Sequence, residues 1–429
     1  MLRVTMTLCL LASAGVSAEL LPRAAAGDWP QWRGPNRDGH AADDETMRTN
    51  WRETPPQLLW SLDGMGRGYA GVSVVGDRLY TTGNRDGAQS LICVDLAQHE
   101  VLWTAKLTDD APQHGYPGSR CTPTIVDDRA YVVTSGGRIS CVDAGDGSVV
   151  WSHPFSKWDG RMSSGWGFSE SPLVDGDRVV FQPGGAAALI VACDRHTGEE
   201  LWASASYTGP KGKDGAGYSS LVRSEAAGVP QYVTLTGRGA VGVRASDGQL
   251  LWGYNRVANG VADIPTPVVW DDYVFVSSGY GDGGSALLQL SAEGSGVAAE
   301  EIYWKTNAEL QNHHGGIIRD GEQLYLGNKH NKGFPVCVEA SSGEMLWGGK
   351  IRGEGQGSAA ITACDGQLIF RYQNGVIAFI RMTPQGYDLL GTFTPEYQED
   401  KSWAHPSVAG GVMYLREQDR LMAYDVAGE

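Results

Sequence analysis

A tryptophan recurs along this chain at nearly constant spacing, and this repeat constrains the fold more than any other feature of the sequence. Each of these residues ends a short apolar run, as in Val149-Val150-Trp151, and successive ones are 43, 48, 51, 50, 52 and 43 residues apart. A fixed period of roughly 20–50 residues indicates an architecture of repeated units, each packed mainly on its neighbours. The positions in register are Trp60, Trp103, Trp151, Trp202, Trp252, Trp304 and Trp347.

Each period contains the same order of strands and turns. A turn such as Asp194–Gly198 precedes the tryptophan run, and an alternating segment such as Arg138–Val142 precedes the turn. A second hairpin turn, for example Asp175–Asp177, lies further upstream and is followed by β-branched and aromatic residues. Eight such turns predict eight units of four short antiparallel strands. Four-stranded units at this spacing predict an all-β fold, an eight-bladed β-propeller.

The last unit ends at Tyr424–Val426 without a tryptophan run of its own. The unassigned run Gln57–Trp60 would supply the missing strand and join the two ends of the chain in one blade. The seventh unit ends near Phe393, where phenylalanine replaces tryptophan. We therefore expect a signal segment at residues 1–18, an N-terminal extension at 19–56 and the propeller at 57–429.

The pattern Cys193-Asp194-Arg195-His196-Thr197-Gly198, followed by Trp202, resembles the PQQ repeat. That repeat occurs in quinoprotein dehydrogenases, which use pyrroloquinoline quinone (PQQ), and in the non-catalytic outer-membrane assembly lipoprotein with the same propeller. The resemblance covers about residues 57–428 and implies the propeller fold. The segment Trp29–Pro35 is similar to the N-terminal segment of a group of exported PQQ-like propellers, and we expect its two tryptophans to pack on the propeller body.

Residues 1–18 have the pattern of a secretory signal peptide, with Arg3 before an apolar stretch and Val16-Ser17-Ala18 at its end. No cysteine follows in the position of a lipid-attachment site, and no later apolar run is long enough to cross a bilayer. The net charge of −16 argues against nucleic acid as a partner. We expect an exported, monomeric protein, periplasmic or extracellular, that associates with the cell envelope.

Six cysteines follow the predicted signal segment, and four of them occupy one repeated position. Equivalent positions on neighbouring blades are too far apart for a disulfide, whose Cα atoms must lie within about 7 Å. Buried free thiols are therefore favoured over disulfides, although the sequence leaves both open. The repeated position holds Cys93, Cys141, Cys193 and Cys337.

The long connections from one blade to the next are expected on one face of the propeller, around the central channel. Loops on a rigid frame are where binding and catalytic residues gather. The candidate residues carried by these loops are Arg120, Trp166, Glu170, Tyr218, Asp263, His313, His314, Gln356, Trp403 and His405.

Each candidate allows a functional and a structural interpretation. Trp166 and Trp403 could stack on a planar ligand or a sugar, or cap the channel. Adjacent residues of a strand point to opposite faces, so His313 and His314 are expected not to act together. One of the pair could face the channel beside His405 and form a metal or acid–base site.

The two acidic candidates also have two interpretations. Asp263 and Glu170 could hold Ca²⁺, or could pair with Arg120 or cap local turns. With His405, they are the candidates for catalysis. The remaining candidates are predicted to bind a ligand.

Two functions from different classes follow. The first is a non-catalytic binding module that recognises a protein or a glycan through the long-loop face. The alternative is a PQQ- and Ca²⁺-dependent dehydrogenase of an alcohol or a sugar, as the resemblance to quinoproteins implies. The sequence has no adjacent cysteine pair and no Cys-x-x-Cys-His haem motif, so it identifies no cofactor and favours the binding module.

Overall fold

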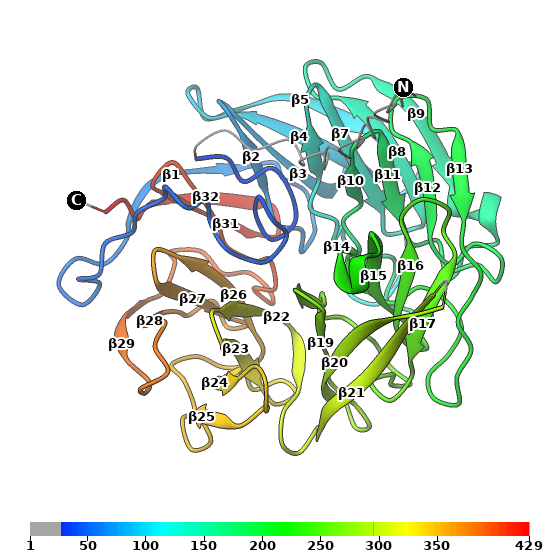
Figure 1. Cartoon of the computed structure of the whole chain (residues 1–429). Helices are drawn as coiled ribbons and strands as arrows, with labels where there is room; N and C mark the ends of the chain where they lie inside the picture. The colour runs from blue at the N-terminus through cyan, green and yellow to red at the C-terminus, as the bar shows by residue number, and fades with distance from the viewer. Residues whose placement is uncertain (1–26, 295, 429) are drawn as a thin grey trace, which may run out of the picture.

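The computed structural model describes residues 27–294 and 296–428, which form a ring of eight four-stranded antiparallel sheets around a central channel (Figure 1). Short strands alternate with turns that hold residues at positive φ, such as Asp127 and Gly147. Within these ranges there is no α-helix, only the 3₁₀ helices η1 (Phe155–Trp158) and η2 (Ala226–Gly228). The predicted all-β propeller is confirmed.

The first four blades are formed by consecutive strands of the chain. They are β2 (Ser73–Val75), β3 (Arg78–Arg85), β4 (Ala88–Asp95) and β5 (Glu100–Lys106); β6 (Thr124–Val126), β7 (Arg129–Thr134), β8 (Arg138–Asp143) and β9 (Val149–Pro154); β10 (Leu173–Asp175), β11 (Arg178–Phe181), β12 (Val191–Asp194) and β13 (Glu200–Ala203); and β14 (Val222–Ser224), β15 (Gln231–Thr236), β16 (Gly239–Arg244) and β17 (Leu250–Tyr254).

The next three blades follow the same order, and the eighth combines both ends of the chain. They are β18 (Val268–Trp270), β19 (Tyr273–Ser278), β20 (Gly284–Glu293) and β21 (Gly296–Thr306); β22 (Asn312–Asp320), β23 (Gln323–Asn328), β24 (Phe334–Glu339) and β25 (Met345–Trp347); β26 (Ala359–Cys364), β27 (Gln367–Tyr372), β28 (Ile377–Arg381) and β29 (Leu389–Phe393); and β30 (Ser407–Ala409), β31 (Val412–Glu417), β32 (Arg420–Asp425) and β1 (Gln57–Asp63).

The eighth blade closes the ring as the sequence predicts. Strand β1 pairs antiparallel with β32, and Figure 1 shows the blue β1 beside the red β31 and β32. Closure removes the two sheet edges that an open ring would expose, so the chain ends hold each other in place.

The registered tryptophans lie between neighbouring blades. The indole N–H of Trp103 donates to the carbonyl of Gly145 in the next blade, and that of Trp151 donates to the carbonyl of Arg195. The turn glycine Gly147 has φ +80° and lies against the ring of Trp103, where a Cβ atom would collide with the indole. The repeated turn and the repeated tryptophan are thus two halves of one contact between blades.

The six cysteines of the described residues are free and buried, as the sequence favours. Cys93, Cys141 and Cys337 lie in the third strand of their blades, each opposite a tyrosine of the second strand. Burial raises the pKa of the Cys93 thiol to about 12, so it remains protonated and behaves as a small apolar side chain.

The N-terminal extension crosses one end of the central channel. Trp29 exchanges two backbone hydrogen bonds with Val74 of the first blade, and the carbonyl of Pro30 accepts one from Ile125 of the second. Further along the segment, Ala41 donates to the carbonyl of Ala363 in the seventh blade. We call residues 27–47 the plug, because they connect the first strands of several blades.

The predicted signal segment lies outside the described residues. Among the residues that the structure does describe, no helix is long and apolar enough to span a membrane.

Candidate functional site

One end of the central channel holds a cavity that we call the funnel, and residues of the plug form part of its lining. The loops that lead into the first strands of the blades form its wall, together with three hairpin turns, and its volume is about 360 Å³. A volume of roughly 300–1,000 Å³ is typical of small-molecule sites. The principal lining residues are Trp32, Arg33, Tyr69, Tyr116, Arg120, Trp166, Tyr218, Tyr280, His313, His314, Gly316, His330, Gln373, Lys401, Trp403 and His405.

The plug supplies two residues of the funnel, Trp32 and Arg33. The indole N–H of Trp32 donates to Thr266 Oγ1 at 3.0 Å, and its ring lies edge-on to His405 with the centroids 4.6 Å apart. Arg33 is buried, with an exposed fraction of 3%. The extension that packs on the propeller body therefore also forms part of the candidate site.

Aromatic rings form a continuous arc along the funnel wall. The ring of Tyr116 lies 5.7 Å from that of Trp166 and 4.9 Å from that of Trp403, centroid to centroid. Tyr116 is 39% exposed, so one side of this arc is open to a ligand. Trp403 continues the arc to His314, 5.1 Å away, and donates its indole N–H to Gln373 Oε1 at 2.8 Å. The arc provides flat apolar surfaces whose positions are set by hydrogen bonds.

The expectation that His313 and His314 point to opposite faces is wrong. Both line the funnel, and their ring centroids are 4.3 Å apart. The reason is an irregularity at the start of β22, where the pairing with β23 is interrupted between Asn312 and Ile317 and Gly316 has φ +83°. The two-residue alternation of a regular strand does not hold across such a break.

The histidines of the funnel remain neutral at neutral pH. Burial lowers the pKa of His314 to about 4 and that of His405 to about 3, and it lowers the pKa of His313 strongly. Neighbouring positive charge adds to this effect, since Arg33 acts on His405. A neutral imidazole has one N–H donor and one acceptor nitrogen, so these residues suit hydrogen bonding to hydroxyl groups.

The funnel contains basic side chains without acidic ones. The guanidinium of Arg120 donates to the carbonyls of Trp166, Gly115 and Tyr116, and so holds two of the loops together. The ammonium of Lys401 lies over the ring of Tyr116, 4.7 Å from its centroid. No carboxylate is among the described residues that line the cavity. Just outside the lining, Asp400 pairs with Lys401 at 3.7 Å and accepts a hydrogen bond from Tyr69.

The acidic candidates lie behind the wall, and neither forms an ion pair with Arg120, in contrast to one of our expectations. Glu170 accepts a hydrogen bond from the backbone N–H of Gln182 at 2.5 Å, and Asp263 accepts one from the side-chain amide of Asn259 at 2.9 Å. Burial raises the pKa of Glu170 to about 8 and that of Asp263 well above its usual range. The Asp263 carboxyl is directed to its own loop, because the short connection offers a nearby donor, whereas the Glu170 carboxyl reaches the residue that follows β11. The expected turn-capping role therefore applies to Asp263.

Gln356 also lies outside the funnel, in an adjacent groove, where its backbone N–H donates to Asn374 Oδ1. The funnel is lined instead by Gln373 and by other residues that were not predicted from the sequence. Tyr280 and His330 come from hairpin turns between the second and third strands of two blades. The aromatic content of these turns is visible in the sequence, but only the blade geometry directs them to the same end as the long loops.

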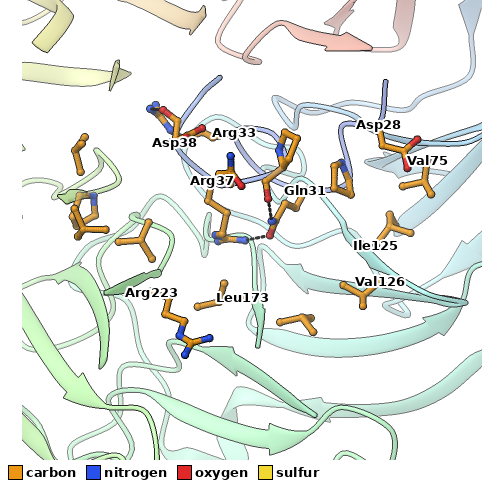
Figure 2. Close-up of a pocket in the computed structure, with 18 of the residues that line it drawn as sticks. Asp28, Gln31, Arg33, Arg37, Asp38, Val75, Ile125, Val126, Leu173 and Arg223 are labelled. Atoms are coloured by element: carbon orange, nitrogen blue, oxygen red, sulfur yellow. Dashed lines mark hydrogen bonds between the residues drawn. The ribbon is translucent and has the colours of Figure 1, made fainter. Parts of the chain in front are cut away.

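A second cavity, of about 440 Å³, lies at the other end of the channel, between the plug and the first strands of five blades. Figure 2 shows Arg37 and Gln31 at its centre and the apolar Ile125 and Leu173 around them. Two of the arginines here have several protein partners: Arg37 donates to Gln31 Oε1 and to carbonyl oxygens, and Arg223 pairs with Asp175 at 2.8 Å. Arg33 lines both cavities. The funnel, whose polar groups are less completely paired, is the better candidate site.

A Ca²⁺ ion of the kind that quinoprotein dehydrogenases use does not fit the funnel. Calcium is held mainly by carboxylates, helped by carbonyl oxygens, whereas the described lining has no carboxylate and offers imidazoles, phenols, cations and a few amide and hydroxyl groups. Across residues 27–294 and 296–428, no group of three or more His, Cys, Asp or Glu is arranged to hold a metal ion.

The fold and the repeats have relatives among known proteins. A family model described as outer membrane protein assembly factor BamB matches residues 40–164 and 156–349, more than half of the chain. The chain belongs to this family of PQQ-repeat propellers. No curated protein is significantly similar to it in sequence.

Solved structures share the fold at low sequence identity. BamB from Moraxella catarrhalis is 14% identical with a TM-score of 0.60, over 87% of this chain and 98% of that chain. The quinohemoprotein alcohol dehydrogenase from Comamonas testosteroni is 13% identical with a TM-score of 0.66, over 95% and 82%. A europium-containing methanol dehydrogenase is 13% identical with a TM-score of 0.63, over 91% and 90%. The propeller is therefore shared by proteins of different function, and the site must decide between them.

Proposed function

We propose that this chain is an exported propeller that binds a glycan in the funnel without changing it chemically. The observation that carries the proposal is the arc of aromatic rings in a cavity of about 360 Å³. Sugar rings present apolar C–H faces that pack on aromatic side chains, and hydroxyl edges that need hydrogen-bond partners. Neutral histidines and Gln373 supply such partners beside the rings.

The shape of the site favours a glycan over a protein as the ligand. Stable protein–protein contacts bury roughly 1,200–2,000 Å² on broad surfaces, whereas this cavity admits a small molecule or the end of a chain. Export is supported by the signal-like pattern of residues 1–18 and by the outer-membrane name of the family. A role at the cell envelope as a monomer is part of the same proposal.

The alternative, a PQQ-dependent dehydrogenase, has less support from the residues of the site. A dehydrogenase of this kind needs Ca²⁺ beside the quinone and a carboxylate base. The acidic candidates Asp263 and Glu170 are buried behind the wall and hydrogen-bonded there. Addition of PQQ and Ca²⁺ to the purified protein, with a redox dye and a panel of alcohols and sugars, is expected to give no turnover. Cofactor-dependent dye reduction would overturn the non-catalytic proposal.

Substitution of the funnel tryptophans tests the glycan proposal. Binding of a panel of neutral and acidic oligosaccharides is measured by isothermal titration calorimetry for wild type, Trp166→Ala and Trp403→Ala. We expect each variant to weaken binding by roughly tenfold or more, because a stacking surface is removed, with a smaller effect on thermal stability.

The matched control is Trp202→Ala. Trp202 is buried between blades, and its indole N–H donates to the carbonyl of Ala245 at 3.1 Å. Its removal should lower the free energy of unfolding by roughly 3–5 kcal/mol and leave the affinity of the folded protein unchanged. Equal affinities in wild type and both funnel variants would refute glycan binding at this site.

A further inference from the structure

The plug places a buried positive charge beside the funnel that forms no ion pair within the described chain, although the nearby Asp38 stabilises it at longer range. Arg33 is 3% exposed and has no ion-pair partner within 4.0 Å in the described residues. One terminal nitrogen, Nη2, donates to the carbonyls of Asp38 and Ile317. The other two nitrogens, Nε and Nη1, are buried without a hydrogen-bond partner. Burial lowers the pKa of Arg33 only to about 10, so the group stays charged at neutral pH.

A second arginine of the same segment shows that this is not a general property of the plug. Arg37 is 4% exposed and, like Arg33, has a positive φ. Its guanidinium donates to Gln31 Oε1 and to the carbonyls of Leu221, Pro172 and Ser171, so each of its three nitrogens has a partner. Leaving a buried donor unpaired costs about 1–3 kcal/mol, and more for a charged group. Arg33 carries that cost and Arg37 does not.

The unpaired part of Arg33 is at the funnel. A Cβ atom added at Gly316 would collide with Arg33 Nη1 and lie 3.1 Å from His405 Cε1, and all three residues line the cavity. His405 Nδ1 and His314 Nε2 are also buried without hydrogen-bond partners. Nitrogen atoms from the plug and from two blades thus lie in one part of the funnel without hydrogen-bond partners.

We propose that the funnel binds a ring-shaped ligand that carries a carboxylate, and that this carboxylate lies against Arg33 with the imidazoles of His405 and His314 beside it. The inference rests on the proposed glycan function and refines it: the glycan is acidic, with a uronic acid at the end that enters the funnel. A carboxylate carries one negative charge, which matches one uncompensated guanidinium, and charged hydrogen bonds of this type are roughly twice as strong as neutral ones. The aromatic arc packs on the sugar ring, and Arg33 recognises the acid.

Calorimetry with matched ligands tests the inference. The probes are digalacturonic acid, its methyl ester and a neutral galactose disaccharide, each titrated into wild type, Arg33→Gln and Arg37→Gln. Wild type is expected to bind the acid roughly tenfold or more tightly than the ester or the neutral sugar. Arg33→Gln should remove this preference, so that acid, ester and neutral sugar bind about equally, whereas Arg37→Gln should keep it.

The outcomes separate this inference from the proposed function. Equal affinity of wild type for acid and ester overturns the carboxylate site while the glycan proposal stands, and this comparison needs no variant to fold. PQQ serves as a planar carboxylate that is not a sugar. If wild type binds PQQ but no sugar, and Arg33→Gln loses PQQ binding, the carboxylate site is retained and the glycan proposal is refuted. A preference for galactose 1-phosphate over the uronate overturns the assignment of the acid. Absence of binding by wild type to every probe overturns both proposals.

Discussion

The two ends of the central channel are built from the same chain segment but differ in how their polar groups are paired. At the plug end, each nitrogen of the Arg37 guanidinium donates to a carbonyl of the loops that lead into the third and fourth blades. At the funnel end, Arg33 and several histidines keep buried nitrogens without partners. Complete pairing stabilises a structure, whereas incomplete pairing at a concave aromatic surface leaves interactions for a ligand. We therefore expect the plug end to contribute mainly to stability and the funnel end to bind the ligand.

The largest loss of stability is expected when Arg37, and not Arg33, is replaced. Arg37→Gln should lower the free energy of unfolding by about 3 kcal/mol, because buried carbonyls of two blades lose their donor. Arg33→Gln should cost about 1 kcal/mol or less, since an uncompensated buried charge is removed together with two hydrogen bonds. Urea denaturation followed by tryptophan fluorescence measures both. Equal losses of unfolding free energy in the two variants would contradict a stabilising role confined to the plug end.

Acid is expected to destabilise the funnel end. The pKa values of His314 and His405 are about 4 and about 3 in the folded protein, against an ordinary value of 6.5. Between pH 6.5 and 4 the unfolded chain takes up protons that the folded chain does not, so stability falls as the pH falls. The contribution of the two histidines to this loss should be at least about 2 kcal/mol, and His314→Gln should reduce it. Thermal unfolding at stepped pH measures it, with exposed His196→Gln as the control. An unchanged acid profile in His314→Gln would contradict the assignment.

The smallest effect concerns Glu170, which lies behind the funnel wall and feels the charge of Arg37. Its pKa is raised to about 8 by burial, so between pH 4.5 and 8 the unfolded carboxyl is ionised while the folded one holds its proton. Stability therefore falls as the pH rises through this range. Glu170→Gln should raise the free energy of unfolding at pH 9 by about 1 kcal/mol and have little effect at pH 5. The exposed Glu199→Gln is the control. A loss of stability at pH 9 would show that the ionised carboxylate is needed there.

The sequence predicted most of the frame and only part of the site. The registered tryptophans, the turn glycines and the Gln57–Trp60 strand were all recognisable, because each takes part in a contact that repeats with the period of the chain. Arg120, Trp166, Tyr218, Trp403 and His405 were placed around the channel because they belong to the long loops. The errors share another cause. His313 and His314 depend on an irregular strand start, and Asp263 and Glu170 depend on which local donor each carboxyl meets.

The sequence by itself determined the eight-bladed ring and its closure by both chain ends, because these follow from local patterns repeated along the chain, and it favoured free buried cysteines without deciding them. Only the tertiary structure decided that the plug reaches the funnel, that Tyr280 and His330 join it, and that Arg33 is left with unpaired nitrogens while Arg37 is not. Arg33 contacts Ile317, 284 positions away, and Arg37 contacts Leu221, 184 positions away. Two arginines four residues apart thus differ in hydrogen bonding because their partners lie far away in the sequence, where no local pattern can indicate them.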